Sequence, residues 1–191
     1  GQAQFDAAVA AYSQALRCRP DYPEAAFNIC NAWRDAGRFP EAIAAYDEAI
    51  RLRPGYGDAL WNQSLALLGN GQLTRGWTQY EWRWRDGDRL AAPDRLGAPQ
   101  WNGEPVAGAR VLVWREQGLG DELMFLTCVP DLAAAGATVT VLVSPRLVSL
   151  VQRALPTVEV LGDGPEVLGS DRRFDWQIPM GSLPKVLRNR V

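Results

Sequence analysis

Residues 23–56 read "PEAAFNICNAWRDAGRFPEAIAAYDEAIRLRPGY", and this stretch decides the fold of the first half of the chain. It contains two runs with helical spacing, at about 23–35 and 40–52. Gly37 lies between the runs, where a glycine commonly ends a helix, and Pro54 follows the second run as a stop. The segment therefore predicts a helix–turn–helix unit.

The same unit recurs along the first half of the chain. Identical residues align when the sequence is shifted by 34 positions against itself: Phe5 with Phe39, Ala8 with Ala42, Tyr12 with Tyr46, Ala15 with Ala49, Pro20 with Pro54, Tyr22 with Tyr56, Ala25 with Ala59, Asn28 with Asn62, Ala32 with Ala66, Gly37 with Gly71 and Tyr46 with Tyr80. The period and residue types resemble the tetratricopeptide repeat, in which small residues let two helices approach and aromatic residues fill the gaps. This resemblance implies an α-solenoid of about two and a half units over residues 1–85.

Stacked repeats of this kind present a concave surface that commonly binds peptides or other partners. Asn28 and Asn62 recur in the first helices of successive units and are the predicted binding residues of this surface. Because residue 1 falls on the second helix of a unit, we expect the chain to be cut from a longer protein with more repeats upstream. A spacer or stabilising role for the repeats is an equal alternative.

The second half has a different pattern. Residues 86–109 carry Gly, Pro and Asp throughout and predict a linker, in which Trp101 is expected to pack on a neighbouring domain. From residue 110 onward, short β-branched runs alternate with helical runs. The expected strands are 110–114, 138–144 and 158–162, and the expected helices are 121–136 and 145–155. This order predicts parallel pairing with right-handed crossovers, so residues 110–191 are expected to form a Rossmann-like α/β domain.

Composition excludes several classes of function. Lys+Arg 20 against Asp+Glu 22 gives a net charge of −2, which favours neither nucleic acid nor an anionic membrane as a partner. The chain has no apolar run of the ~18–20 residues that span a membrane and no signal-peptide pattern at its start, so a cytoplasmic location is expected. With no His and only Cys18, Cys30 and Cys128, neither a metal site nor His-dependent catalysis is predicted.

The turn after the first expected strand, "GLGDEL", begins like a dinucleotide-binding turn. Leu123 stands in place of the third glycine and Ser144 in place of a ribose-binding carboxylate, so no NAD or FAD cofactor is predicted. Gly118 and Gly120 permit positive φ and a close backbone approach to a ligand. Asp121 is then either a helix N-cap, which stabilises a helix by about 1 kcal/mol, or a base. The two roles are compatible.

Longer motifs resemble the lipopolysaccharide heptosyltransferase type of glycosyltransferase (family 9). The stretch at 117–162 carries a glycine–Asp turn after the first strand, a helix leading to Pro130, a second strand "GATVTVLV", and a proline before the third strand. The order of motifs along the whole chain is similar to bacterial proteins in which tetratricopeptide repeats precede such a domain. These motifs are "GWTQYEWRW" at 76–84, "PQWNGE" at 99–104, "EQGLGDE" at 116–122 and "FDWQIPMGSLP" at 174–184.

The resemblance implies the N-terminal lobe of a two-lobed GT-B enzyme that inverts the anomeric carbon. By motif match, Asp121 is the catalytic base that takes the proton of the acceptor hydroxyl. Glu116 and Gln117 are candidates to contact the acceptor, with a turn-stabilising role as an equal alternative. Ser182 and Lys185 are candidates to border the cleft.

The resemblance also implies the partners. A GT-B enzyme holds its nucleotide-sugar donor mainly in the second lobe, whereas this chain stops at Val191 in the first. The fragment is therefore expected to be inactive by itself, with a saccharide or protein as the acceptor in the full-length parent. The alternative, from a different class, is a non-catalytic scaffold whose repeats bind proteins.

Overall fold

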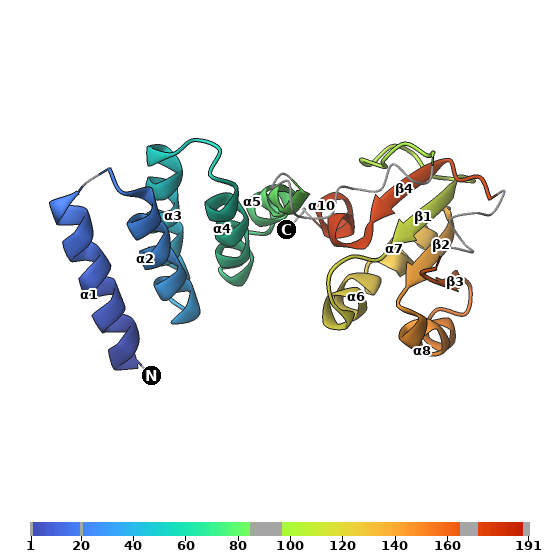
Figure 1. The fold of residues 1–191 in the computed structure, drawn as a ribbon. Coiled ribbons are helices and arrows are strands. Elements are labelled where there is room, and N and C mark those ends of the chain that lie inside the picture. The colour runs from blue at the N-terminus through green and yellow to red at the C-terminus, as the bar shows by residue number, and fades with distance from the viewer. Residues whose placement is uncertain (1, 20, 85–96, 165–171, 189–191) are drawn as a thin grey trace. The chain divides into compact units, whose positions relative to one another are not determined.

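A computed structural model describes residues 2–19, 21–84, 97–164 and 172–188. These residues form two compact units, a helical unit within 2–84 and an α/β unit within 97–188 (Figure 1). The predicted fold class, helical repeats followed by a parallel-sheet α/β domain, is confirmed.

The helical unit is a succession of helices in which each packs against the next. Its elements are α1 (Gln2–Cys18), α2 (Pro23–Asp35), α3 (Phe39–Leu52), α4 (Gly57–Gly69), α5 (Leu73–Tyr80) and the 3₁₀ helix η1 (Glu81–Trp84). The pairs α2–α3 and α4–α5 are two successive helix–turn–helix units, and the bounds of α2 and α3 agree closely with the predicted ones. Gly37 and Gly71, at the ends of α2 and α4, have φ of +74° and +77°, a conformation that glycine adopts without strain.

Small residues set the spacing between these helices. Ala42, Ala49, Ala59 and Ala66 have no exposed surface, and the ring of Tyr46 fills the space among them. A side chain larger than a methyl group at these positions would push the helices apart. The repeated alanines and aromatic residues are therefore the core of this unit.

A chain of polar side chains also crosses the helical unit from α3 through α4 to α5. The Gln63 side chain is fully buried, and its Nε2 donates to Asp47 Oδ1 at 2.7 Å and to the Ile43 carbonyl at 3.1 Å. Its Oε1 accepts a hydrogen bond from Gln79 Nε2 at 2.8 Å, and Arg75 pairs with Asp47 at 2.6 Å. The buried Gln63 amide is thus satisfied by its neighbours.

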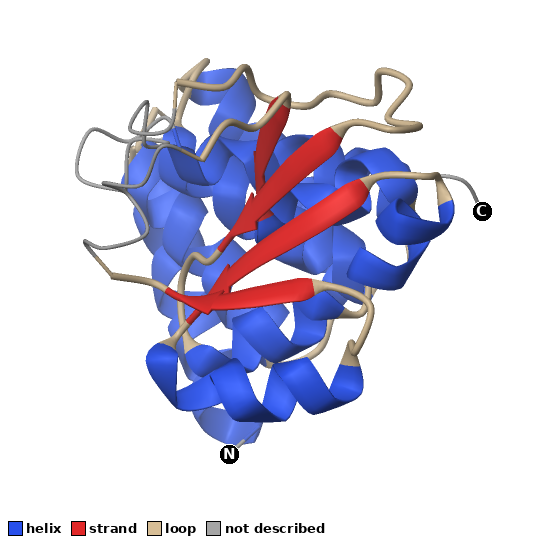
Figure 2. Cartoon of the chain, turned by 90° about the vertical axis from the view of Figure 1, so that its right-hand side faces the viewer, coloured by secondary structure: helices blue, strands red, loops and turns tan. Residues whose placement is uncertain are grey.

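The α/β unit is built on a parallel sheet of order β3-β2-β1-β4 (Figure 2). The strands are β1 (Arg110–Trp114), β2 (Thr138–Val143), β3 (Glu159–Gly162) and β4 (Trp176–Pro179). The helices are α6 (Leu119–Leu126), α7 (Val129–Ala134), α8 (Val148–Ala154) and α10 (Leu183–Leu187), with 3₁₀ helices η3 (Pro145–Leu147) and η4 (Met180–Ser182). Residues 111–114 and 139–143 are all buried, as expected for strands covered on both faces.

One predicted helix differs from the one in the structure. The single helix expected over 121–136 is two helices, α6 and α7, separated at Thr127 and Cys128. Pro130 lies in the first turn of α7, where its missing N–H costs nothing; one continuous helix would have lost a hydrogen bond there. The first helix also begins at Leu119, two residues earlier than expected.

Residues 97–101 run along the free edge of β4. The Trp101 N–H donates to the Gln177 carbonyl at 2.8 Å, and the Gln177 N–H donates to the Pro99 carbonyl at 2.9 Å. Ala98 and Trp101 are buried, and the Trp101 indole N–H donates to the Glu104 carbonyl at 2.8 Å. The prediction that Trp101 packs on a neighbouring domain is confirmed.

Among the described helices, none combines the length and apolar character needed to cross a bilayer.

Candidate functional site

The candidate site lies at the carboxyl ends of β1 and β4. The strand order β3-β2-β1-β4 reverses between these two neighbours, and ligands of doubly wound sheets bind outside the carboxyl ends at such a point. The chain leaves β1 through residues 115–118 into α6, and it leaves β4 through η4 into α10. The contact between α6 and η4 brings these two exits together.

Asp121 is the third residue of α6 and is partly exposed. Its Oδ2 accepts a hydrogen bond from the Gly118 N–H at 3.1 Å, and no other hydrogen bond of this carboxylate is found among the described residues. The N-cap residue is Gly118, so the N-cap position proposed for Asp121 is wrong, although the carboxylate does satisfy a backbone N–H at the helix start. One carboxylate oxygen is thereby held, and the other accepts no hydrogen bond from the described residues.

The backbone of the turn does not depend on its glycines for positive φ. Gly118 and Gly120 permit positive φ but do not use it: Gly118 has φ of −98° and Gly120 lies inside α6, whereas Gln117 has φ of 60°. A β-carbon at Gly120 would meet no atom within 4 Å, and one at Gly118 would meet only Asp121 Oδ2, at 3.4 Å. The glycines are therefore not required by backbone strain, and the space beside them is open.

Glu116 joins the exits of β1 and β4. Its side chain is buried, and Oε1 accepts a hydrogen bond from the Gly181 N–H at 2.7 Å. A β-carbon at Gly181 would collide with the Glu116 carboxylate, so only glycine fits there without displacing it. Ser182, the next residue, is buried as well, whereas Lys185 in α10 is partly exposed.

A second buried carboxylate, that of Glu122, was not expected from the sequence. This side chain has no exposed surface; Oε1 accepts from Arg115 Nε at 2.8 Å and Oε2 accepts from the Ser144 N–H at 2.8 Å. Arg115 also lies 3.5 Å from Asp163, just after β3. Glu122 therefore ties together the exits of β1 and β2, and such a buried charge persists only when it is paired and hydrogen-bonded.

Arg115 keeps its charge in this arrangement. Partial burial disfavours the guanidinium cation, but the hydrogen bond and charge of Glu122, with a further contribution from Asp163, outweigh it and raise the pKa of Arg115. The sequence signal for this group was the acidic pair that ends "GLGDE". Nothing in the sequence says which member of that pair faces inward.

The structure thus brings most of the predicted site residues to one edge of the sheet. Those that lie there are Glu116, Gln117, Gly118, Gly120, Asp121 and Ser182, with Lys185 one turn further along the chain. No group of three or more His, Cys, Asp or Glu side chains among the described residues is arranged to hold a metal ion.

The two asparagines predicted for the repeat surface lie in the helical unit, on α2 and α4. Asn62 donates to the Asp58 carbonyl at 2.8 Å and accepts a hydrogen bond from Arg34, which also pairs with Asp35. Asn28 is partly exposed. Asn62 is therefore already engaged between α2 and α4.

Comparison with known proteins identifies a family for the helical unit. A family model described as "Tetratricopeptide repeat" matches residues 1–57 and 31–80. The helical unit consists of tetratricopeptide repeats. The chain is also 33% identical over 155 residues to Protein FlbA of Caulobacter vibrioides, an alignment that covers 78% of this chain and 26% of that protein.

A solved structure, a mutant O-GlcNAc transferase of Thermobaculum terrenum, overlaps with 17% identity and a TM-score of 0.40. That overlap covers 82% of this chain and 37% of the transferase chain. The chain spans about a quarter of the length of the curated relative that it matches, 26%.

Proposed function

We propose that this chain is the acceptor-side part of an inverting, nucleotide-sugar-dependent glycosyltransferase, linked to tetratricopeptide repeats. Asp121 acts as the base that takes the proton of the acceptor hydroxyl. The observation that carries the proposal is the position of its carboxylate: at the carboxyl edge of the leading strand, partly exposed, with Oδ2 held by the Gly118 N–H and open space beside the adjacent glycine. The heptosyltransferase-like motifs of the sequence support the same role.

The chemistry is a single displacement. The acceptor oxygen forms a bond to the anomeric carbon while the bond from that carbon to the nucleoside diphosphate breaks, and the diphosphate leaves with the electron pair. The acceptor proton passes to Asp121, a step that typically contributes about 10²–10⁴-fold to the rate. On this proposal the donor is held outside this chain, so residues 1–191 alone do not turn over.

The other site residues have supporting roles in this proposal. Glu116 and Glu122 are buried and hydrogen-bonded, so they hold the strand exits in place and do not touch substrate. Gln117 is exposed and lies beside Gly118, which suits a contact to the acceptor. Lys185 supplies a cationic side chain near the exit of β4.

The domain boundary also follows as a proposal. Because Ala98 and Trp101 are buried and residues 99–101 pair with Gln177 on β4, we infer that the α/β domain begins by Ala98 and not at Arg110. Expression of residues 97–191 and of 110–191 tests this boundary. Only the longer piece is expected to unfold cooperatively.

The test of the catalytic role uses the full-length parent. Release of nucleoside diphosphate from a panel of UDP-, GDP-, dTDP- and ADP-sugars is measured for the native protein and for Asp121→Asn. The variant is expected to lose at least about 100-fold in rate while keeping its circular dichroism spectrum. Asp131→Asn, an exposed carboxylate of α7, is the matched control and keeps its activity. Unchanged turnover in Asp121→Asn means that this carboxylate is only a helix-start residue.

A second candidate function is a protein-interaction scaffold. The observation that favours it is the tetratricopeptide-repeat unit itself, because stacked repeats commonly bind peptides or proteins. On this alternative Asn28 and its surroundings on α2 contact the partner. It is favoured over the enzyme if the full-length parent hydrolyses none of the nucleotide sugars and Asn28→Asp weakens partner binding.

A further inference from the structure

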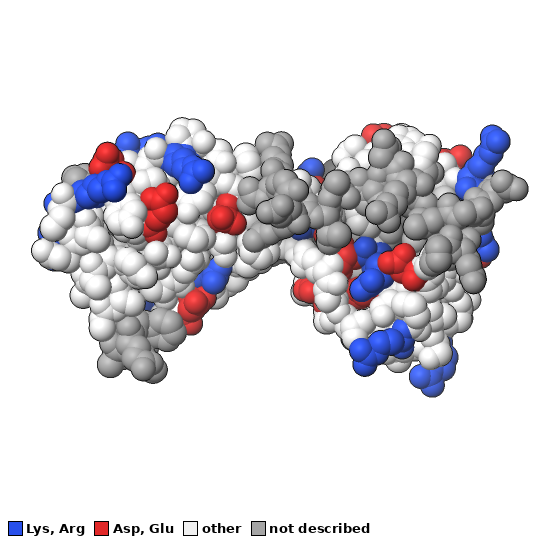
Figure 3. Space-filling view, viewed as in Figure 1, with Lys and Arg blue, Asp and Glu red and all other residues white. Residues whose placement is uncertain are grey.

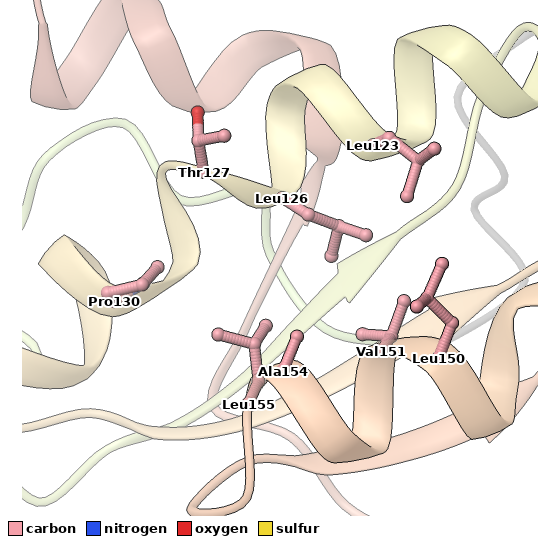
Figure 4. Close-up of a pocket in the computed structure, with 8 residues that line it drawn as sticks. All are labelled: Leu123, Leu126, Thr127, Pro130, Leu150, Val151, Ala154 and Leu155. Carbon is pink, nitrogen blue, oxygen red and sulfur yellow. The ribbon is translucent and has the colours of Figure 1, made fainter.

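An apolar groove runs between α6 and α8 on the α/β unit. It has a volume of about 220 Å³, and Leu126 and Pro130 line one wall while Val151 and Leu155 line the other. Figure 4 shows Leu123 and Leu150 on the two facing helices at its opening. The groove is formed by elements of the α/β unit alone.

The side chains at the opening are unusually exposed for their type. Leu123 and Leu150 are each 44% exposed, and the adjacent Met124 is 51% exposed. Val151, deeper in the groove, is 2% exposed. A contiguous apolar surface of this kind, with a recessed floor, is typical of an interaction site.

The α8 wall carries positive charge beside the exposed leucine. Arg153 is exposed and lies three residues after Leu150 on α8, so the two share one flank of this helix; Arg146 is also exposed and lies in η3, immediately before α8. No carboxylate of the described residues pairs with either arginine. Figure 3 shows basic side chains at the lower end of the α/β unit, where α8 lies in Figure 1.

The groove-lining residues of the opposite wall carry no charge; they are Leu123, Leu126, Thr127 and Pro130. On α6 the Asp121 carboxylate accepts from the Gly118 N–H and the Glu122 carboxylate is buried against Arg115. On α7, Asp131 pairs with Arg188 at 2.9 Å. The groove is therefore apolar along its floor and positive along one rim, and its occupant should carry the opposite charge on that side.

The size and shape of the groove select among occupants. A volume of about 220 Å³ lies below the ~300–1,000 Å³ typical of small-molecule pockets. A bilayer takes up apolar side chains that protrude, as Leu123 and Leu150 do, but it does not fill the recess between two helices where Leu126 and Val151 lie. A few apolar side chains from one face of a helix fit such a groove, as in helix-in-groove recognition.

We propose that the groove between α6 and α8 docks an amphipathic helix of a partner protein, with leucine-type side chains in the groove and acidic side chains facing Arg146 and Arg153. This interaction is independent of sugar transfer. It uses residues of α6 that follow Asp121 but not Asp121 itself.

Two synthetic helical peptides of about 18 residues, five helical turns, test the proposal. Both carry leucines at positions i, i+3, i+4 and i+7; one has Glu and the other Lys on the flanks. Binding to the whole 191-residue chain is followed by fluorescence anisotropy. The Glu peptide is expected to bind at least about tenfold more tightly than the Lys peptide, because like charges across an interface repel.

Three variants locate the binding. Leu150→Asp is expected to weaken the binding of the Glu peptide at least about tenfold, because it puts a negative charge at the mouth of the groove. Ser149→Ala, on the same helix but outside the groove, changes no charge beside Arg146 and Arg153; it is the control and leaves binding unchanged. The double variant Arg146→Glu with Arg153→Glu is expected to reverse the preference, so that the Lys peptide binds more tightly. Because both arginines are exposed, this variant is expected to fold, and it tests the proposal even if Leu150→Asp does not fold.

Four outcomes overturn the proposal. They are equal affinity for the two peptides, no effect of Leu150→Asp on a folded chain, self-association that Leu150→Asp abolishes, and binding to phosphatidylglycerol vesicles when neither peptide binds. Self-association would assign the groove to a second copy of the chain, and vesicle binding would assign it to a membrane surface.

Discussion

The two units of this protein bury different kinds of side chain at the places that define them. In the helical unit, the described residues with no exposed surface are mostly small or apolar: Ala42, Ala49, Ala59, Ala66, Tyr46, Cys30 and Leu67, together with the neutral polar residues Gln63 and Ser64. At the carboxyl edge of the α/β unit, the buried residues include the carboxylates of Glu116 and Glu122. The packing of the repeat helices depends mainly on shape, whereas this edge of the α/β unit depends on hydrogen bonds and charge.

This difference determines how each unit responds to change. A core of small apolar groups loses stability gradually as packing is altered, in proportion to the volume added or removed. A buried carboxylate is compatible with the fold only while its partners are present, and it fixes their geometry in return. Glu122 fixes the exits of β1 and β2, and Glu116 fixes the exits of β1 and β4, so the edge proposed to hold the site is held rigidly from both sides.

The largest expected effect comes from Glu122→Ala. The substitution leaves the Ser144 N–H and Arg115 without their buried partner, which typically costs about 3–5 kcal/mol. Labelling with iodoacetamide reports each unit separately, because Cys128 is buried in the α/β unit and Cys30 in the helical unit. Cys128 is expected to react at least about 100-fold faster in the variant, while the rate at Cys30 stays the same.

Two further variants sharpen this result. Glu122→Gln keeps an acceptor for the Ser144 N–H and is expected to lose less stability than Glu122→Ala. Glu159→Ala removes an exposed carboxylate of the same unit, paired with Arg172, and is expected to change Cys128 labelling little. If Glu159→Ala and Glu122→Ala accelerate Cys128 equally, the contrast between the two units is wrong.

The helical unit could be predicted closely from the sequence. Each helix contacts the next one along the chain, so the repeat of Ala, Tyr and Gly at 34 residues contains the packing pattern directly. The bounds of α2 and α3, the helix end at Gly37 and the packed face containing Ala42 and Tyr46 follow from local rules alone.

Most strands of the α/β unit could be predicted from the sequence, but the hydrogen bonds at the carboxyl edge of its sheet could not. β1, β2 and β3 follow from β-branched runs, whereas β4 was not among the expected strands, because Trp176–Pro179 contains one β-branched residue, Ile178. The bonds that define the edge join residues far apart, such as Glu116 to Gly181 and Glu122 to Ser144. No periodicity connects such pairs, so the positions of these carboxylates required the fold.

A second prediction uses pH to separate the units. Burial raises the pKa of the Cys30 thiol to about 12, above its value in the unfolded chain. The unfolded state therefore loses this proton first, and stability present below about pH 8.5 is lost as the pH rises toward 12. Between pH 9 and 10, the helical unit of Cys30→Ala is expected to lose up to about 1 kcal/mol less of its free energy of unfolding than that of the native chain. Hydrogen exchange of peptides within 57–80 measures this difference. An unchanged slope would mean that the thiol is accessible to water in the native state.

The smallest expected effect on stability concerns Gly120, and its sign is informative. Gly120 lies inside α6, its φ is not positive, and a β-carbon there would meet no atom within 4 Å. Gly120→Ala should therefore stabilise the α/β unit by about 0.4–1 kcal/mol, because alanine restricts the unfolded chain without straining the helix. Gly181→Ala is the contrast, since its β-carbon collides with Glu116 and is expected to destabilise by about 1–3 kcal/mol.

A glycine that reduces the stability of its own helix needs another reason to be there. On the proposed function, the space beside Gly120 admits the acceptor next to Asp121, so Gly120→Ala should lower sugar transfer by the full-length parent while raising the resistance of Cys128 to labelling. The two readouts then move in opposite directions for Gly120→Ala, and both fall for Gly181→Ala. A Gly120→Ala protein that is more stable and fully active would show that no substrate approaches this turn. The site would then have to be sought away from the edge that the two buried carboxylates hold in place.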